Sequence, residues 1–187
     1  MGRDKALLDW HGRPLVVHVC EQVAAAVDGP VVVVGASGQQ LPELAGRVEV
    51  AEDLVADRGP LEGLRSGFVA IGGRADVAFV TSVDAPHLRP ELIRTLVARL
   101  GDADAVMPET DGFAHPLTAV YRTSLVELVD GLLDAGERRA RLVGERCRTV
   151  FLSRAVLLQD PALRDADPDL RSLADVDTPA DLEAASS

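Results

Sequence analysis

The sequence predicts a single α/β domain, doubly wound, with a mostly parallel sheet and helices on both faces. Short apolar runs bounded by turn residues occur at 31–34, 78–83 and 103–107 and are typical of strands buried on both faces. Apolar residues recur at helical spacing between these runs, at 14–27 and 90–100. The 187 residues fit one domain, and a composition 47% hydrophobic but only 3% aromatic predicts a core of Val, Leu and Ala.

Charge and cysteine content argue against several classes of protein. The formal net charge of −11 argues against a nucleic acid or an anionic membrane as partner, but not against a nucleotide held by local groups. Cys20 and Cys147 lie far apart without metal-ligand spacing, so we expect no disulfide framework and no zinc site. A reducing compartment, the cytoplasm, is therefore expected. The sequence has no apolar run of about 18 residues, so no membrane span is expected.

The first residues place a single cation just before apolar positions. Lys5 follows Met1-Gly2-Arg3-Asp4 and precedes Ala6-Leu7-Leu8. It is interpreted either as a point charge on a phosphate or as part of a solvated terminus. His18, within the predicted helix over 14–27, is expected at the boundary of the core rather than as a ligand.

Two loops lie between the first strands and the next helix. A strand over 31–34 and a short strand over 47–51 are expected, and the second leads to Glu52-Asp53. The segment Arg58-Gly59-Pro60-Leu61-Glu62-Gly63 forms a fixed turn that opens a helix over 61–71. Such a turn can offer N–H and C=O groups to a base or a phosphate, or can serve only as a helix entry.

Asp84 is the strongest candidate for chemistry. It follows the strand over 78–83, and Pro90 opens the next helix. Ligands of open α/β sheets bind outside the carboxyl ends of the strands, where Asp84 is expected. A carboxylate beside a nucleotide suits Mg²⁺, which takes one or two carboxylates plus phosphate oxygens. The alternative is that Asp84 caps a helix or stabilises a turn.

The second half of the chain holds another group of polar candidates. After the strand over 103–107, Asp111-Gly112 predicts a hairpin turn. Asp111, His115 and Arg122 are expected to gather charge in one place. His115 precedes a proline and is therefore extended, which can hold its ring toward a pocket. The alternative is a hairpin with incidental polar residues.

Arginines cluster after the next helix. A helix is expected over 124–133, capped by Thr123 or Ser124, and Arg138, Arg139 and Arg141 follow it. In so acidic a chain the cluster suits an anion, although a solvated helix end is a reasonable alternative.

The last part of the chain gives weaker signals. Residues 149–152 predict a strand, and 159–174, rich in Asp and Pro, predict irregular structure. The chain closes with Asp175-Val176-Asp177 and a short helix that Thr178 caps, with Pro179 at its first position.

Taken together, these stretches resemble the molybdenum cofactor guanylyltransferase family over nearly the whole chain. The resembling segments are the end of the nucleotide signature (Met1–Lys5), the guanine-side loops (Glu52-Asp53 and Gly59–Gly63), the magnesium-aspartate motif (Thr81–Pro86), the molybdopterin side (Asp111-Gly112 with His115-Pro116, and Ala135–Arg139) and the closing motif (Asp175–Pro179). Each is weak alone, but together, in the right order, they make the resemblance specific.

The resemblance implies a Rossmann-like nucleotidyltransferase that moves GMP from GTP to the phosphate of molybdopterin carrying molybdenum and releases pyrophosphate, with Mg²⁺ as cofactor. It implies GTP and molybdopterin as partners, together with molybdoenzymes or other proteins of cofactor synthesis. By the same resemblance, the nucleotide half is expected at about 1–100 and the acceptor half at about 101–187 of one domain.

The resemblance also implies the roles of individual residues. The nucleotide-binding residues are Lys5, Asp53, Gly59, Pro60, Leu61, Gly63 and Asp84, of which Lys5 and Asp84 are catalytic and Asp84 holds the metal. The acceptor-side residues are Asp111, His115, Arg138, Arg139, Asp175 and Asp177.

The chain departs from the family pattern in two places. It starts inside the nucleotide signature, so we expect a shortened chain that lacks a strand and a glycine turn of roughly a dozen residues. By resemblance, that strand is the middle one of the sheet, beside the nucleotide. Asp175 and Asp177 stand where asparagines are usual, and two extra carboxylates near phosphates would repel them.

Other functions remain open from the sequence. A cytidylyltransferase for the same cofactor, or another nucleotidyltransferase of small substrates, would use the same motifs. An inactive paralogue that binds the cofactor without transferring GMP would explain the missing glycine loop.

Overall fold

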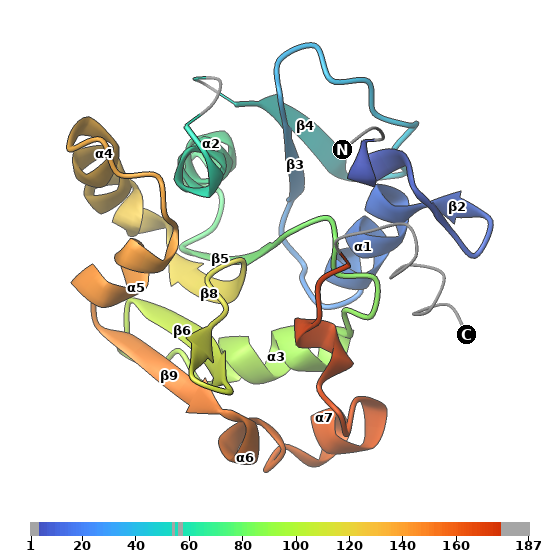
Figure 1. Cartoon of the computed structure of the whole chain (residues 1–187), viewed down its shortest axis with the longest axis vertical. Coiled ribbons are helices and arrows are strands. Elements are labelled where there is room, and N and C mark those ends of the chain that lie inside the picture. The colour runs from blue at the N-terminus through green and yellow to red at the C-terminus, as the bar shows by residue number, and fades with distance from the viewer. Residues whose placement is uncertain (1–3, 54, 56–57, 177–187) are drawn as a thin grey trace.

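The computed structural model describes residues 4–53, 55 and 58–176 and confirms the α/β class (Figure 1). The strands are β1 (Asp9–Trp10), β2 (Arg13–Pro14), β3 (Val31–Gly35), β4 (Val48–Glu52), β5 (Val77–Thr81), β6 (Ala105–Thr110), β7 (Phe113–Ala114), β8 (Thr118–Arg122) and β9 (Thr149–Ser153). The α-helices are α1 (Leu15–Ala24), α2 (Pro60–Ile71), α3 (Pro90–Ala98), α4 (Val126–Asp134), α5 (Arg141–Arg146), α6 (Arg154–Leu157) and α7 (Pro161–Ala166). Short 3-10 helices are η1 (Lys5–Leu7), η2 (Thr123–Leu125) and η3 (Arg171–Leu173).

The main sheet is mixed, with β5, β6 and β9 running in one direction and β8 running against them. Strand β8 lies between β5 and β6 and runs antiparallel to both, whereas β6 and β9 are parallel. The cause is the hairpin between β6 and β7, which reverses the chain. Its two turn residues, Asp111 and Gly112, have φ values of 54° and 80°, as a type I′ turn requires. The predicted Asp-Gly turn is therefore confirmed.

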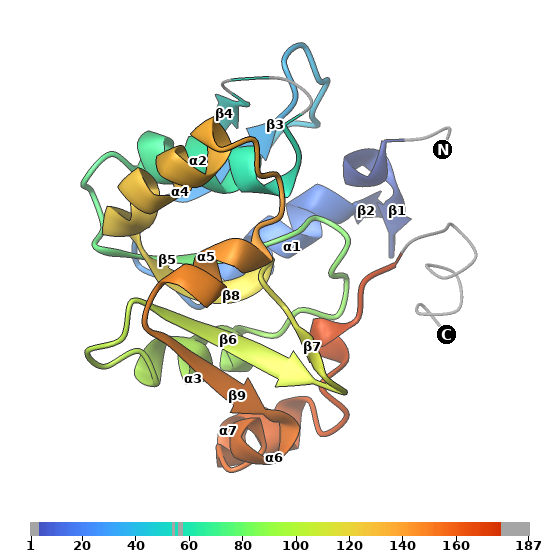
Figure 2. The ribbon, with the colours of Figure 1, turned by 60° about the vertical axis from the view of Figure 1, so that its left-hand side comes forward.

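Helices cover both faces of this sheet, as predicted (Figure 2). Alternate residues point to opposite faces. Val106 and Val120 join the cluster formed with α1, α3, α6 and α7. Ala105 and Tyr121, their neighbours along the strands, join the cluster formed with α2, α4 and α5.

Strands β3 and β4 form a second, two-stranded parallel sheet. In the described part of the chain, β3 pairs only with β4 and β5 pairs only with β8. The predicted strands 31–34 and 78–83 exist, but Val32–Val34 and Phe79–Thr81 are only half-buried rather than fully buried.

Two predictions about the helices are wrong. Residues 159–174 are not irregular, because Asp160 accepts hydrogen bonds from Ala162 N and Leu163 N and so caps α7. No side-chain cap bond forms at η2 or α4, since Thr123 Oγ1 donates to the carbonyl oxygen of Ala75 instead. The helix expected after Thr178 lies outside the described residues. No helix in the described ranges is long and apolar enough to cross a bilayer.

Candidate functional site

The turn after β5 brings Asp84 to the N-terminal segment. Strand β5 ends at Thr81, so Asp84 lies in the following turn and not directly at the strand end. Lys5 Nζ donates to Asp84 Oδ2 at 2.8 Å, and the two side chains are 27% and 19% exposed. Lys5, the candidate for phosphate binding, and Asp84, the candidate for metal binding, are therefore neighbours in the fold.

Lys5 is held by folded structure. Asp4 caps η1 by accepting from Ala6 N, and its other oxygen accepts from Gln39 Nε2 at 2.6 Å. Ala6 is buried against Val16 and Val31. The alternative of a solvated terminus at Lys5 is therefore wrong.

Asp84 has one oxygen to offer to a ligand. Oδ2 binds Lys5, whereas Oδ1 is buried and has no hydrogen-bond partner among the described residues. A buried carboxylate oxygen without a partner is costly unless a cation or a donor approaches it. One carboxylate completed by phosphate oxygens and water is the usual arrangement for Mg²⁺. The described residues contain no group of three or more acidic, His or Cys side chains that could hold a metal ion.

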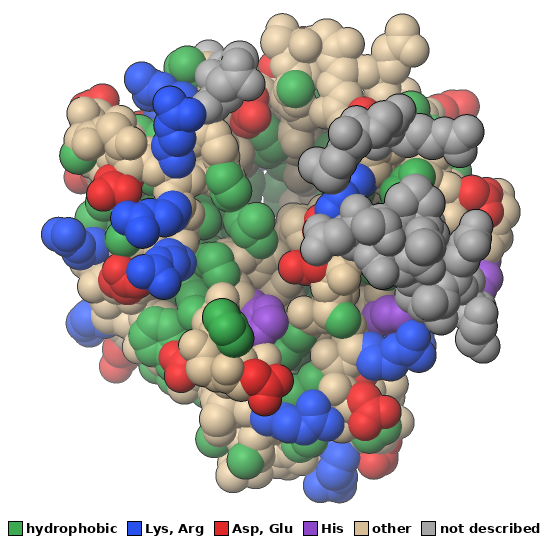
Figure 3. Space-filling model, in the orientation of Figure 1, with side chains coloured by type: hydrophobic (Ala, Val, Ile, Leu, Met, Phe, Trp, Pro, Cys, Tyr) green, Lys and Arg blue, Asp and Glu red, His purple; other side chains and the backbone are tan. Residues whose placement is uncertain are grey.

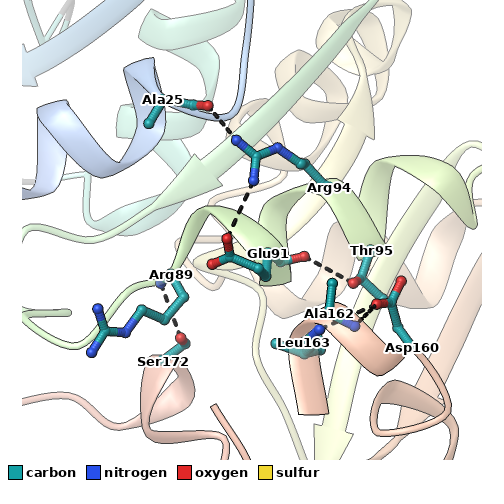
Figure 4. Close-up of polar contacts among 9 residues, drawn as sticks. All are labelled: Ala25, Arg89, Glu91, Arg94, Thr95, Asp160, Ala162, Leu163 and Ser172. Carbon is teal, nitrogen blue, oxygen red and sulfur yellow. Dashed lines mark hydrogen bonds and ion pairs between the residues drawn. The ribbon is translucent and has the colours of Figure 1, made fainter. Parts of the chain in front are cut away.

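The loop around Asp84 is fixed by contacts from three directions. His18 Nε2 on α1 lies 2.9 Å from the carbonyl oxygen of Pro86, where a ring N–H can donate. Ser172 Oγ donates to the carbonyl oxygen of His87. It also accepts from Arg89 N (Figure 4). Val176 N donates to the carbonyl oxygen of Asp84 at 2.9 Å. The expectation for His18 is met, since it is half-buried at the edge of the core.

Helix α3, which follows this loop, is fastened to α1. Arg94 Nη2 donates to the carbonyl oxygen of Ala25 at 2.6 Å, and Arg94 also pairs with Glu91 (Figure 4). The helix thus gives the Asp84 loop a rigid downstream anchor.

A second polar group lies where β4 meets the start of α2. Ser66 on α2 donates to the Asp53 carboxylate, whose Oδ1 is buried without a hydrogen-bond partner among the described residues. Burial raises the pKa of Asp53, and the Ser66 hydrogen bond only partly opposes the rise. A Cβ at Gly63 would lie 3.9 Å from Asp53 Oδ1, so the glycine keeps the backbone beside the carboxylate open.

The turn before α2 is built on Gly59, whose φ of 73° and ψ of −168° suit only glycine. Pro60 follows at the exposed first turn of the helix. Leu61 is fully buried, and its N–H donates to the carbonyl oxygen of Arg138 at 3.2 Å. Leu61 therefore shapes the turn from inside, and its side chain is closed to a ligand.

The arginine cluster lies against this turn. A Cβ at Gly59 would lie 3.4 Å from both Cβ and the carbonyl oxygen of Arg138. Arg138 and Arg139 are exposed, and Arg139 pairs with Glu137 at 3.4 Å. The segment expected on the acceptor side thus borders the loop expected on the guanine side.

The β6–β7 hairpin brings together two of its three predicted charges. Asp111 is exposed at the tip, and burial lowers the pKa of His115. The His115 ring turns back on the hairpin, with Nε2 2.7 Å from Thr110 Oγ1. Arg122 does not join them, because it donates to the carbonyl oxygens of Ala103 and Gly101 at the other end of β8. The predicted grouping of Arg122 with Asp111 and His115 is wrong.

The closing motif approaches the Asp84 loop. Val176 binds the Asp84 backbone, so the exposed Asp175 lies next in the chain to that contact. Asp177 lies outside the described residues.

Comparison with known proteins identifies the family. A family model described as "MobA-like NTP transferase domain" matches residues 1–150. The chain belongs to the MobA-like NTP transferase family. The chain is 40% identical to a probable molybdenum cofactor guanylyltransferase of Mycobacterium ulcerans, over 98% of this chain and 86% of the relative.

Two solved structures share the fold of this MobA-like chain. Molybdopterin-guanine dinucleotide biosynthesis protein A of Archaeoglobus fulgidus has a TM-score of 0.74 at 23% identity, covering 99% of this chain and 90% of its own. A 2-C-methyl-D-erythritol 4-phosphate cytidylyltransferase of Thermus thermophilus has a TM-score of 0.71 at 16% identity, covering 97% and 91%. The fold alone therefore does not decide which base is used.

Sequence reasoning missed some polar residues of the MobA-like site. Glu62 is only 1% exposed, and its two nearest cations, Arg65 and Arg58, lie at 3.8 and 3.9 Å. Ser66 and Ser172 hold Asp53 and the Asp84 loop. For Ser66, its helical spacing from Gly63 was a usable signal. For Ser172, nothing local in the sequence indicates the contact with His87.

Proposed function

We propose that the chain transfers GMP from GTP to molybdopterin carrying molybdenum, forming the guanine dinucleotide cofactor and pyrophosphate. The single observation that carries this proposal is the Lys5–Asp84 pair beyond the carboxyl end of β5, with Asp84 Oδ1 left open. A cation and a metal-binding carboxylate side by side are suited to a triphosphate.

In the proposed reaction, an oxygen of the molybdopterin phosphate attacks the α-phosphorus of GTP. A bond forms between that oxygen and the α-phosphorus, and the bond from the α-phosphorus to the oxygen bridging to the β-phosphate breaks, so pyrophosphate leaves. The protein contributes positioning and electrostatic stabilisation rather than covalent chemistry. Asp84 would hold Mg²⁺, which when bound neutralises charge on the phosphates.

The two substrates are proposed to meet across the sheets. Lys5 leaves Asp84 and pairs with the phosphates of GTP, while Asp53 and the backbone of Gly59 and Gly63 face the guanine. The residues proposed to contact the acceptor substrate are Asp111, His115, Arg138, Arg139, Asp175 and Asp177. In this proposal residues 1–100 form the nucleotide half and 101–187 the acceptor half.

We further propose that the chain acts in the cytoplasm, with molybdoenzymes or other proteins of cofactor synthesis as partners. Cys20 and Cys147 are both free thiols, which suits a reducing compartment.

A transfer assay tests the proposal. GTP labelled at the α-phosphate is incubated with the protein, Mg²⁺ and molybdopterin, and label in the product and released pyrophosphate are measured. We expect transfer of the label to be abolished by excess unlabelled GTP but not by excess CTP. Preference for CTP would replace the guanylyltransferase with a cytidylyltransferase. Binding of molybdopterin with no pyrophosphate release would identify an inactive binding protein.

A further inference from the structure

A small polar pocket of about 180 Å³ lies against the loop that carries Asp84. One wall is formed by His87 and Arg89, from the segment that leads into α3. The other wall runs from Ala166, at the end of α7, to Arg171, at the start of η3. None of the residues that line this pocket has a role in the proposed GMP transfer.

The basic groups of the pocket have hydrogen-bond donors to offer. Arg171 Nη2 lies 2.7 Å from His87 Nε2. Because a guanidinium group can only donate, His87 accepts at Nε2 and carries its proton on Nδ1. Arg89 is exposed, and its guanidinium group has no hydrogen-bond or ion-pair partner among the described residues. Figure 4 shows this group extending away from Glu91 and Arg94.

The acidic groups of the pocket are engaged in other contacts. Asp167 is only 5% exposed, and its two oxygens accept from Arg171 N and Ser172 N. Asp169 Oδ1 pairs with Arg154 Nη2 at 3.8 Å. Side-chain donors therefore outnumber the available acceptors, so the pocket suits an anion better than a cation.

Two positive charges act on one imidazole in this pocket. Burial is the largest cause that lowers the pKa of His87, and Arg171 and Arg89 lower it further, whereas Asp167 acts in the opposite direction. An anion among these groups would relieve the repulsion between them. The formal net charge of the chain is −11, yet Lys and Arg side chains gather locally on the face shown in Figure 3. Local groups therefore decide whether an anion binds.

The two walls of the pocket are joined by Ser172. Its Oγ donates to the carbonyl oxygen of His87 and accepts from Arg89 N at 3.0 Å. Ser172 is 1% exposed, and its own N–H donates to Asp167. The backbone that carries the basic side chains is therefore fixed, which reduces the entropy that a ligand must remove on binding.

We propose that this pocket binds a phosphate-type dianion, free phosphate or pyrophosphate, through the guanidinium groups of Arg89 and Arg171 and the Nδ1–H of His87. Guanidinium groups match phosphate oxygens with paired N–H donors. The bound anion fastens the loop that carries Asp84 to η3. The site shares no residue with those proposed to contact GTP or molybdopterin, and binding of the anion does not require GMP transfer.

Calorimetric titration of the 187-residue protein with inorganic phosphate, and separately with pyrophosphate, tests the site at constant ionic strength. The first variant is Arg89→Gln. The second is Arg171→Gln, checked by thermal melting because Arg171 also binds His87. The matched control is Arg99→Gln, at the other end of α3, where the side chain is exposed and likewise has no polar partner among the described residues. Lys5→Gln reports on binding at the proposed nucleotide site.

We expect Arg89→Gln and Arg171→Gln each to weaken anion binding at least about tenfold, because each removes a charge-assisted contact. Arg99→Gln and Lys5→Gln should retain the site. Saturating anion should also slow hydrogen exchange of the Arg89 amide several-fold, since its partner Ser172 lies between the two walls.

The two anions distinguish the source of the ligand. Tighter binding of phosphate would support a site for free phosphate, and tighter binding of pyrophosphate would support a site for the product of the proposed transfer. Three results would overturn the proposal: an equal loss of affinity in Arg99→Gln and Arg89→Gln, a loss in Lys5→Gln alone, or no saturable binding of either anion at millimolar concentration.

Discussion

Lys5 Nζ lies 2.8 Å from Asp84 Oδ2, although 79 positions separate the two residues in the chain. The contact ties the N-terminal segment to the turn after β5 and leaves Asp84 Oδ1 open to a metal. We therefore expect a change at Lys5 and a change at Asp84 to affect the proposed GMP transfer in different ways.

Asp84→Asn is expected to lower GMP transfer by about 100-fold at ordinary magnesium, because an amide neither neutralises Lys5 nor binds Mg²⁺ as a carboxylate does. The measurement is transfer rate against magnesium concentration, with melting as the check on folding. Asp102→Asn, at an exposed position away from the site, is the matched control. Full activity of Asp84→Asn would rule out the metal role.

Lys5 is the only lysine in the sequence, so amine-directed acetylation can modify only Lys5 and the N-terminal amine. Magnesium–GTP is expected to slow acetylation of Lys5 several-fold, since a phosphate-bound ammonium is a poor nucleophile. Mass spectrometry of the modified peptides separates the two sites, and the N-terminal amine serves as internal control. An unchanged Lys5 rate at saturating GTP would contradict the phosphate contact.

Asp53→Asn is expected to separate stability from binding. Burial raises the folded pKa of Asp53 above its unfolded value, so its contribution to stability is present below the unfolded pKa and is lost as pH rises through the folded one. At pH 7 the neutral amide should therefore melt slightly higher, while the KM for GTP rises about tenfold because a base contact is lost. Melting curves and GTP kinetics measure the two effects. A lower melting temperature with unchanged KM would assign Asp53 a structural role only.

Replacing Arg138 and Arg139 together by Ala is expected to raise the KM for molybdopterin about tenfold and the KM for GTP less, because paired guanidinium groups suit an anionic acceptor. Arg154→Ala and Arg164→Ala, exposed elsewhere, provide the matched control. Because Arg138 also packs against the Gly59 turn, the GTP measurement is decisive. A larger effect on GTP than on molybdopterin would move the cluster to the nucleotide.

Stability should fall as pH drops below about 6.5, the ordinary histidine value. Burial, the largest cause, lowers the pKa of His18 and His87, and for His87 Arg171 and Arg89 add to it. The unfolded state then takes up protons first, so stability is complete above the unfolded pKa and is lost as pH falls toward the folded values.

Melting temperature between about pH 5 and pH 8, the usual range of histidine titration, measures this loss. His18→Gln keeps a donor for the Pro86 carbonyl but does not titrate, and should flatten the curve. His11→Gln, at an exposed position, is the control. An equal slope in both variants would mean that His18 is not responsible.

Local signals predicted the parts of the fold that depend on local chemistry. The Asp111-Gly112 turn and the strand at 31–34 depend on φ preference and apolar runs, and the structure contains both. The mixed sheet was not predictable in this way, because the place of β8 between β5 and β6 depends on long-range pairing. The cap at Asp160 was missed because Asp-Pro content suggested a loop, although Asp before Pro is also a helix start.

The candidate site shows the same division. Asp84 and Lys5 were found as residues, but their direct pairing depends on the tertiary fold. Arg122 was wrongly grouped with His115 because the two residues are close in sequence. Strand β8 lies between them and places Arg122 at its opposite end. The burial of Glu62 follows from packing around α2, which no spacing in the sequence encodes.

Trp10 is the only tryptophan of the chain, and its ring stands edge-on to His87 with 5.4 Å between ring centroids. It is 4% exposed, and its neighbour His87 belongs to the loop that carries Asp84. The emission of a single buried indole depends on the charge of an adjacent imidazole. The chain thus contains a single indole fluorophore, whose ring neighbours are His11, His18 and, from the Asp84 loop, His87, and its emission reports on these histidines without any added label.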